Sequence, residues 1–252
     1  MKNLIKIAHR GAKGYAPENT LFAFQKAIDL GCDAIELDVH LSLDGELVVI
    51  HDEKVNRTTN GTGFVNQLLT KELKTFLIDE KHEIPTLKEV LDLTDRKCIV
   101  NIELKSYETA EKVVVLIEDY IANKNWKYAD FLVSGFDWNA IQSLRFLNDQ
   151  IPIGILTETN LDLAFAFAKF IKAEVLLPYF HLLNKENIKK IQEKGIKVIV
   201  WTVNESEDII FVKSLQVDGI ISDFPDKIYP VDETLQLKVG AQVMFVKNDL
   251  SF

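Results

Sequence analysis

The sequence has few cysteines, few positive charges and no long apolar run, and each shortage excludes a class of protein. Its two cysteines, Cys32 and Cys98, stand far apart in apolar surroundings, so we interpret them as buried apolar residues rather than as a disulfide or a metal pair. The formal net charge of −9 argues against a nucleic-acid surface, which needs a basic stripe. No run approaches the ~18 apolar residues of a membrane span, and residues 1–7 are too short for a signal peptide. We therefore expect a cytoplasmic protein with no stable membrane insertion.

The composition is that of an ordinary globular protein. Of its 252 residues, 47% are hydrophobic and 27% are charged, which is enough apolar material for a sizeable core. The length suits one or two domains and is typical of a single α/β barrel. An acidic chain binds an anionic substrate only through a local patch or a bound cation, so any such function requires one of the two.

Short apolar, β-branched runs alternate with longer segments of helical period along most of the chain. The expected strands span residues 4–8, 34–39, 99–104, 131–136, 153–156, 174–177, 197–202 and 219–222. The expected helices span residues 20–30, 87–94, 109–123, 138–147, 161–170, 185–194 and 207–214. Strands separated by helices favour a parallel sheet with right-handed crossovers, and strands this apolar need cover on both faces. We therefore predict a (β/α)8 TIM barrel, with a doubly wound sheet as the alternative.

Two segments depart from this alternation. The first follows the second strand, where Asp44-Gly45 between alternating apolar residues predicts a hairpin with a two-residue turn. Residues 52–84 then form an insertion in place of a short loop, with helix expected to resume near Thr86, and loops this long are often functional lids. The second segment is the tail at 229–252, which follows the last expected strand. We therefore predict a barrel domain over residues 1–228 and a C-terminal extension of unknown role outside it.

Charged residues cluster at the C-terminal ends of the expected strands, where barrel enzymes carry their active sites. Glu36 and Asp38 are two apart on one strand and so point to the same face, and Glu103 has the same spacing from Lys105. Three carboxylates on adjacent strands make an oxygen site suited to a hard divalent cation, Mg²⁺ or Ca²⁺. A network of ion pairs with Arg10 and Lys105 explains the same pattern, and strand spacing alone does not decide between the two.

Two histidines are expected to join this cluster. His9 follows the first strand, and a two-residue turn at Asp44-Gly45 would place His51 opposite Asp38. A pair of imidazoles beside a metal suits phosphodiester cleavage, because one removes a proton from the attacking hydroxyl while the other protonates the leaving oxygen. Either histidine alone would be better explained as a hydrogen-bonded core or rim residue. Two histidines expected beside three carboxylates favour a catalytic role over a structural one.

The remaining histidines are interpreted as surface or structural residues. His40 is expected to alternate away from Asp38, and His82 falls in a charged segment of the insertion; His181 is given no site role either. Asn19, just before the first helix, is interpreted as its N-cap.

In these residues the sequence resembles the glycerophosphodiester phosphodiesterase family. The resemblance covers about residues 4–228 in the family's order, and residues 52–84 occupy the place of its characteristic insertion. The matching segments are His9-Arg10-Gly11, Ala16-Pro17-Glu18-Asn19-Thr20, Glu36-Leu37-Asp38-Val39, Asp44-Gly45, His51-Asp52, Arg57-Thr58-Thr59, Ile84-Pro85-Thr86-Leu87, Asn101-Ile102-Glu103-Leu104-Lys105, Trp201-Thr202-Val203-Asn204 and Asp218-Gly219-Ile220-Ile221-Ser222-Asp223.

The resemblance implies a reaction and the residues that perform it. The implied reaction is hydrolysis of a glycerophosphodiester to glycerol 3-phosphate and an alcohol, through attack by the neighbouring glycerol hydroxyl and a cyclic phosphate that water opens. The implied roles are acid/base catalysis for His9 and His51, binding of Mg²⁺ or Ca²⁺ for Glu36, Asp38 and Glu103, phosphate binding for Arg10 and Lys105, and lining of the glycerol pocket for Trp201.

Two other functions remain open. A related barrel could act on lysophospholipids or sphingomyelin-like diesters, for which residues 64–69 and the tail are the candidate apolar rims. The other is a barrel that binds a ligand without catalysis. A protein with no catalytic function would be expected to lack one or more of these charged residues, and here all of them are present. We expect a small-molecule substrate as the partner and no nucleic acid, and a homo-oligomer stays open.

Overall fold

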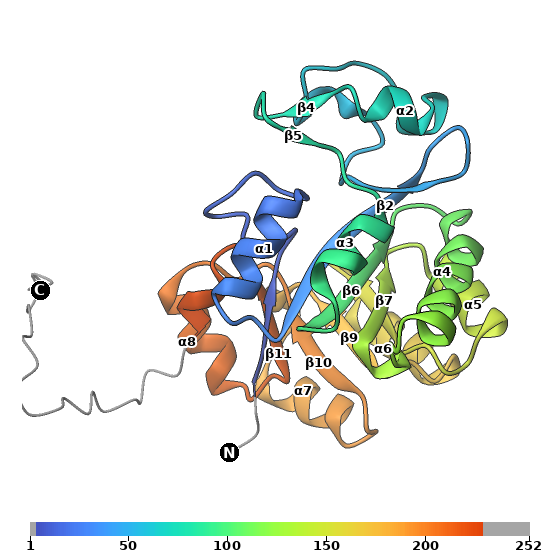
Figure 1. Ribbon diagram of the computed structural model, residues 1–252. Coiled ribbons are helices and arrows are strands. Elements are labelled where there is room, and N and C mark those ends of the chain that lie inside the picture. The colour runs from blue at the N-terminus through green and yellow to red at the C-terminus, as the bar shows by residue number, and fades with distance from the viewer. Residues whose placement is uncertain (1–3, 229–252) are drawn as a thin grey trace, which may run out of the picture.

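The computed structural model describes residues 4–228, so the predicted C-terminal extension at 229–252 lies outside the described residues. Parallel strands form a barrel surrounded by helices, with one lobe of chain standing above it (Figure 1). The barrel strands are β1 (Ile5–Ala8), β2 (Ala34–Leu41), β6 (Ile99–Leu104), β7 (Phe131–Gly135), β8 (Ile153–Thr157), β9 (Val175–Pro178), β10 (Lys197–Val200) and β11 (Gly219–Ser222). The helices around them are α1 (Leu21–Asp29), α3 (Leu87–Thr94), α4 (Thr109–Asn123), α5 (Trp138–Leu147), α6 (Leu161–Phe170), α7 (Lys185–Gln192) and α8 (Ser206–Ser214).

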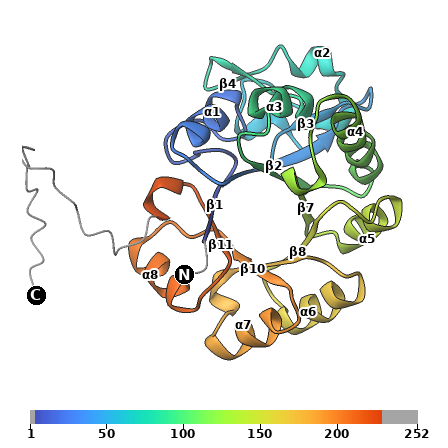
Figure 2. The ribbon, with the colours of Figure 1, turned by 60° about the horizontal axis from the view of Figure 1, so that its bottom comes forward.

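Strand β1 closes the ring because it pairs on both of its edges. It lies parallel to β11, with Ile5 opposite Gly219, and parallel to β2, with Ile7 opposite Ala34. The order around the ring is β1, β2, β6, β7, β8, β9, β10, β11, with helices on its outside (Figure 2). The predicted (β/α)8 barrel is therefore confirmed, and the doubly wound alternative is excluded. No helix within residues 4–228 is both long and apolar enough to cross a membrane.

Alternation along the strands divides the apolar side chains between two layers. Outward residues such as Leu37 and Ile102 pack with the helices in the larger apolar cluster. Inward residues such as Ile7, Leu177 and Ile199 form a second cluster that fills the barrel. Towards the C-terminal ends the inward positions become polar, and the candidate site is built on this upper part of a packed interior.

The hairpin after β2 differs from its prediction by one residue. Strand β3 (Leu47–Val49) pairs with β2 so that His40 faces Val48, and the loop holds three residues, with Gly45 in the left-handed region at φ +80°. Three-residue loops of this kind also place a glycine last, so Asp44-Gly45 does not select between the two lengths. The consequence is that Ile50, rather than His51, lies opposite Asp38, and its N–H donates to the Asp38 carbonyl at 3.1 Å.

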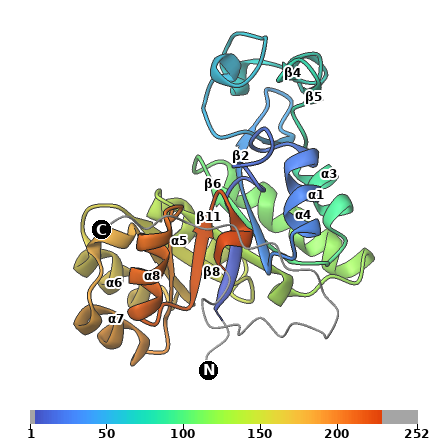
Figure 3. The ribbon, with the colours of Figure 1, turned by 90° about the vertical axis from the view of Figure 1, so that its left-hand side faces the viewer.

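Residues 52–84, which we call the insertion lobe, stand above the C-terminal end of the barrel (Figures 1 and 3). The lobe contains η1 (Val55–Arg57), η2 (Val65–Gln67), α2 (Thr70–Leu73), β4 (Leu77–Ile78) and β5 (His82–Glu83), so helix resumes earlier than expected, for one short turn. Its buried apolar side chains pack with Val48 of β3 and with Ile50 in a separate small cluster, to which the lobe contributes Val55, Val65, Leu73, Ile78 and Ile84. This cluster ties the lobe to β3 and gives it a core of its own.

Candidate active site

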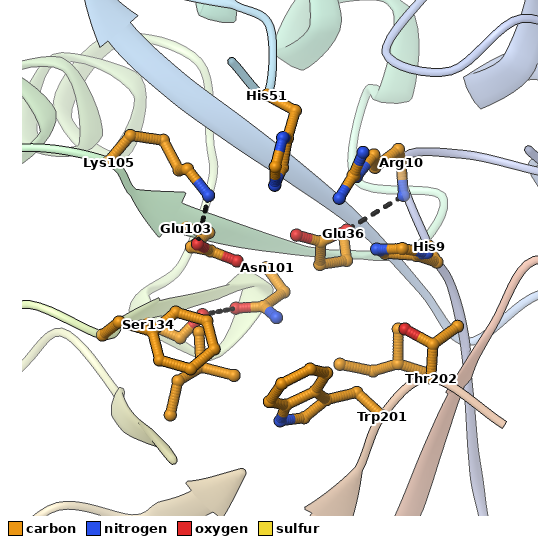
Figure 4. A pocket seen from close by; sticks show the side chains of 13 residues that line it. His9, Arg10, Glu36, His51, Asn101, Glu103, Lys105, Ser134, Trp201 and Thr202 are labelled. Atoms are coloured by element: carbon orange, nitrogen blue, oxygen red, sulfur yellow. Dashed lines mark hydrogen bonds and ion pairs between the residues drawn. The ribbon is translucent and has the colours of Figure 1, made fainter. Parts of the chain in front are cut away.

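One cavity of about 130 Å³ opens at the C-terminal end of the barrel, beneath the insertion lobe. One wall is charged and the other largely apolar, as Figure 4 shows. The charged wall consists of His9, Arg10, Glu36, His51, Glu103 and Lys105, and the apolar wall of Phe136, Leu156, Trp201 and Ile221. These include every predicted site residue except Asp38, which is 1% exposed and lies behind the charged wall. The fold thus gathers the predicted residues from β1, β2, β6 and β10 and from the segment after β3.

The three carboxylates lie together as predicted from strand spacing. Glu36 and Asp38 point into the barrel from β2, and β6 places Glu103 opposite Asp38 in the strand register. One oxygen from each of the three side chains lies within 4.8 Å of the other two. Such a set of carboxylate oxygens fits a hard divalent cation.

Burial controls the charge state of these carboxylates. Desolvation and then the charge of Asp38 raise the pKa of Glu36 well above its ordinary value, and the same two causes raise the pKa of Glu103 to about 7. Burial also opposes ionisation of Asp38, but Lys105 and Arg10 outweigh it and hold the pKa of Asp38 below its ordinary value. A cation bound here would favour the ionised form of all three groups.

The alternative network of ion pairs is partly present. Lys105 Nζ lies 2.8 Å from Glu103 Oε1 and 3.4 Å from Asp38 Oδ1, and Arg10 Nε lies 3.3 Å from Asp38 Oδ2. Yet within residues 4–228 no lysine or arginine forms an ion pair with Glu36, and buried Asp38 Oδ1 accepts no hydrogen bond. The two basic side chains therefore leave a buried oxygen that a cation would satisfy, and the residues fit a metal site.

The loop after β1 aims the backbone at this cluster. Arg10 has a φ of +51°, which turns its N–H toward Glu36 Oε2 at 2.9 Å. Gly11 follows at φ +79°, and a Cβ there would lie 2.7 Å from the carbonyl carbon of Ala23 in α1. Only glycine allows this approach of loop to helix, which explains why the segment reads His9-Arg10-Gly11.

Each of the two predicted catalytic histidines is held by an aspartate. His9 Nδ1 lies 2.6 Å from Asp223 Oδ1, and His51 Nδ1 lies 2.6 Å from Asp52 Oδ1. Both rings point toward the carboxylates from different sides of the cavity (Figure 4). In a neutral ring whose Nδ1 donates to a carboxylate, Nε2 is an unprotonated acceptor directed at the cavity, and in an imidazolium Nε2 is a donor.

The role expected for Asn19 was wrong. The N-cap of α1 is Thr20, whose hydroxyl accepts from the N–H of Ala23. Asn19 instead has a φ of +57° and donates from Nδ2 to Asp38 Oδ2 at 2.9 Å, with 1% of its surface exposed. Both residues are good caps by type, but Asn tolerates the left-handed backbone that this loop requires, while Thr does not.

The prediction that His40 alternates away from Asp38 was also wrong. The two residues are two apart on β2 and so share a face. His40 Nε2 lies 3.1 Å from the carbonyl oxygen of His51, and burial lowers the pKa of His40. A neutral ring that donates to this carbonyl supports the backbone of His51, so the structural interpretation of His40 fits the contact.

Sequence reasoning gave no role to two groups that support the site. Asp223 and Asp52 follow β11 and β3 and hold the two histidines. Their place in the quoted motifs was a signal for both, and for Asp223 so was its position at the end of an expected strand. Trp201, predicted to line the pocket, donates from Nε1 to the Leu177 carbonyl at 2.7 Å. Its ring meets Phe136 edge to face, with centroids 5.4 Å apart, and this pair forms much of the apolar wall.

Comparison with known proteins agrees with this geometry. A profile of the Glycerophosphoryl diester phosphodiesterase family matches residues 9–227. The chain is 37% identical to a glycerophosphodiester phosphodiesterase from Caldanaerobacter subterraneus subsp. tengcongensis over 90% of this chain and 97% of that one. It is 34% identical to the putative glycerophosphodiester phosphodiesterase YhdW of Bacillus subtilis, over 88% and 95% of the two chains.

Among solved structures, a phosphodiesterase from Oleispira antarctica in complex with its product sn-glycerol-3-phosphate superimposes with a TM-score of 0.83. The two are 27% identical, and the match covers 90% of this chain and 95% of that one. The predicted family and enzyme class are thereby confirmed: the chain belongs to the glycerophosphoryl diester phosphodiesterase family.

Proposed function

We propose that this protein hydrolyses glycerophosphodiesters to glycerol 3-phosphate and an alcohol, with a divalent cation on Glu36, Asp38 and Glu103 and acid/base catalysis by His9 and His51. The observation that carries the proposal is that two aspartate-held imidazoles and the carboxylate cluster meet at one cavity. The product bound by the Oleispira antarctica relative supports glycerol 3-phosphate as the product here.

An acidic chain must supply local positive charge to bind a phosphodiester. The charged wall offers Arg10 and Lys105, and both line the cavity. A bound Mg²⁺ or Ca²⁺ would polarise the attacking hydroxyl and offset phosphate charge. The two basic side chains would then hold the remaining phosphate oxygens, since both already lie beside carboxylates that the cation would neutralise.

The two histidines divide the proton transfers. Burial, with smaller effects of Lys105 and Arg10, lowers the pKa of His51 although Asp38 and Asp52 act to raise it, so its ring is suited to be neutral and to take the proton from the neighbouring glycerol hydroxyl. His9, on the other side of the cavity, would enter this step as the imidazolium, with its Nδ1–H held by Asp223, and would give its Nε2 proton to the leaving oxygen. The resulting cyclic phosphate is opened by water with the two roles reversed, which follows from microscopic reversibility.

The apolar wall suits the carbon side of glycerol. Trp201 and Phe136 both line the cavity and pack edge to face, so an amphipathic three-carbon unit would meet carbon on their side and polar groups on the charged wall. The cavity is small, about 130 Å³. Space of this size favours enclosure of the reacting glycerol phosphate, with the alcohol group outside.

A lysophospholipid substrate needs an apolar rim for its chain. The candidate rim at 64–69 does not provide it, because Val65 is 1% exposed within the lobe's own cluster and Phe64 and Leu68 are only partly exposed. A non-catalytic binding barrel is disfavoured because every predicted charged position is retained at the cavity or directly behind it.

A substrate panel tests the proposal. Purified protein should release glycerol 3-phosphate from glycerophosphocholine and glycerophosphoethanolamine at a much higher kcat/KM than it releases choline from a lysophosphatidylcholine. Running each arm with Mg²⁺, Ca²⁺ and excess chelator identifies the cation. Preference for the lysophospholipid would favour the alternative substrate, and no turnover with any diester, despite calorimetric cation binding, would favour a binding barrel.

A further inference from the structure

Arg57 of the insertion lobe donates hydrogen bonds to Asp52, the aspartate that contacts His51. It is the last residue of η1, and its guanidinium donates from Nε to Asp52 Oδ2 at 2.7 Å and from Nη2 to Asp52 Oδ1 at 2.9 Å. Two such bonds to one carboxylate fix its plane as well as its position. Asp52 Oδ1 is also the atom that lies 2.6 Å from His51 Nδ1. The orientation of the imidazole therefore depends on a carboxylate that Arg57 orients.

The same guanidinium is anchored on the barrel. Arg57 donates from Nη2 to Glu18 Oε1 at 2.7 Å and from Nη1 to Glu18 Oε2 at 3.2 Å. Glu18 lies in the loop between β1 and α1, where Arg10 Nη1 also donates to it at 2.8 Å. Burial opposes ionisation of Glu18, but Arg57 and Arg10 outweigh it and lower the pKa of Glu18 to about 2. Arg57 thus links Asp52, at the start of the lobe, to Glu18 of the β1–α1 loop.

Stability alone does not explain this arrangement. The Arg57 side chain is 47% exposed, and ion pairs at exposed positions are typically worth only ~0–1 kcal/mol. The lobe is also held by an apolar cluster and by its own backbone bridges, Lys54 with Phe64 and Thr59 with Ile78. Four donor contacts in the plane of one guanidinium also exceed what a lysine ammonium supplies.

From these contacts we infer that Arg57 is a positioning residue: anchored by Glu18, it holds Asp52 so that His51 keeps Nδ1 protonated and presents Nε2 to the cavity. The inference rests on the acid/base role proposed for His51. It assigns a purpose to the insertion lobe, which supplies both Asp52 and Arg57 at the mouth of the barrel. Glu18 and Asp52 do not line the cavity, so we expect them to act through Arg57 and His51.

The tautomer of His51 is the direct readout, and it does not depend on turnover. In protein labelled with ¹⁵N-histidine, five imidazoles contribute signals, and we expect His51 to show a protonated Nδ1. Arg57→Ala should shift His51 toward a mixture of tautomers and leave His9 unchanged. Arg57→Lys should restore the tautomer only in part. An unchanged His51 signal in Arg57→Ala would overturn the inference, whatever the activity.

Kinetic coupling supplies the second readout. Arg57→Ala should lower kcat/KM by about 10–100-fold, as expected for loss of a group that orients a site residue. If Arg57 acts through Asp52, the same substitution in an Asp52→Asn background should cost no more than about 3-fold. Equal losses in the two backgrounds would contradict the proposed path through Asp52.

The control is an arginine of similar exposure away from the site. Arg96 is 37% exposed and donates to Asp95 at 2.7 Å. Arg96→Ala should leave both kcat/KM and the His51 signal unchanged, with a melting temperature close to that of Arg57→Ala. Activity losses of equal size in the two variants would show a general effect of arginine removal and would overturn the inference. If His51→Ala itself retains activity, the proposed function fails, while the tautomer measurement still decides the role of Arg57.

Discussion

The His9 imidazole and the Asp223 carboxylate form a dyad across the seam where the barrel closes, with Nδ1 and Oδ1 2.6 Å apart. The seam is the parallel pairing of β1 with β11, which brings together residues near the two ends of the described chain. Asp223 is held in turn by Asn204, whose Nδ2 donates to Oδ2 at 2.9 Å and whose Oδ1 accepts the Asp223 N–H at 2.9 Å. The pairing that closes the barrel therefore brings Asp223 to His9 and orients its imidazole.

Replacing the carboxylate of this dyad should impair chemistry more than binding. In Asp223→Asn the amide can donate to Nδ1, which favours the imidazole tautomer with its proton on Nε2. We expect kcat to fall on the order of 10²–10⁴-fold with a much smaller change in KM, measured as release of glycerol 3-phosphate. A kcat within a few-fold of the unmodified protein would show that Asp223 does not act on His9.

His51 and His40 should respond very differently to the same substitution. His51→Ala removes a proton-transfer group and should lower kcat by ~10²–10⁴-fold. His40→Ala removes one hydrogen bond to the His51 carbonyl, so we expect a free energy of unfolding lower by about 1 kcal/mol and a kcat lowered only several-fold. Steady-state kinetics and urea unfolding of both variants provide the check. A His40→Ala protein as inactive as His51→Ala would give His40 a part in the chemistry.

Two substitutions of Asn19 should separate its effect on cation binding from its effect on backbone strain. Asn19→Gly keeps the left-handed backbone and loses only the hydrogen bond to Asp38, whereas Asn19→Ala also strains the backbone. Both should weaken Mg²⁺ or Ca²⁺ binding about 10-fold in calorimetric titration. Asn19→Ala should in addition be about 1 kcal/mol less stable than Asn19→Gly. Unaltered cation affinity in both variants would separate Asn19 from the metal site.

Glu103 should make the stability of the cation-free protein depend on pH. Burial, then the charge of Asp38, raises the pKa of Glu103 from an ordinary value of 4.5 to about 7 in the folded protein. Between these values the folded state holds a proton that the unfolded state has lost. The contribution of Glu103 to the free energy of unfolding is therefore fully present below pH 4.5 and is lost as pH rises to about 7.

The matching measurement compares melting temperatures in excess chelator. The unmodified protein should lose stability relative to Glu103→Gln as pH rises from about 4.5 to about 7, because glutamine cannot ionise. Saturating Mg²⁺ should reverse the loss, since a bound cation favours the ionised carboxyl. Parallel pH profiles for the two proteins would contradict the proton assignment at Glu103.

The regular part of the fold was predictable because strand and helix periodicity is local. Residues 99–104 and 219–222 are strands as expected, and the helices at 87–94, 109–123, 138–147 and 161–170 have their expected bounds. The strands expected to reach Phe136 and Thr202 end earlier, at Gly135 and Val200. There the chain leaves the sheet to present site residues, and apolar character alone does not mark that departure.

The site was predictable in so far as it follows strand alternation. Glu36, Asp38 and Glu103 converge because side-chain direction and parallel register are regular. The contacts that the sequence did not disclose are made by loops: the three-residue turn that shifts β3 and the position of Asn19. The bond from Arg57 to Glu18 is another, since it joins residues of a lobe and a loop through folded geometry alone.

The most direct test of cation-assisted acid/base hydrolysis is release of glycerol 3-phosphate from glycerophosphocholine during a chelator titration, with His9→Ala measured beside the unmodified protein. We predict turnover that falls to background as the cation is removed and returns when Mg²⁺ or Ca²⁺ is restored. We also predict a rate for His9→Ala that is ~10²–10⁴-fold lower at saturating cation. Turnover that persists in excess chelator, or a His9→Ala rate within a few-fold of the unmodified protein, would contradict the proposed mechanism.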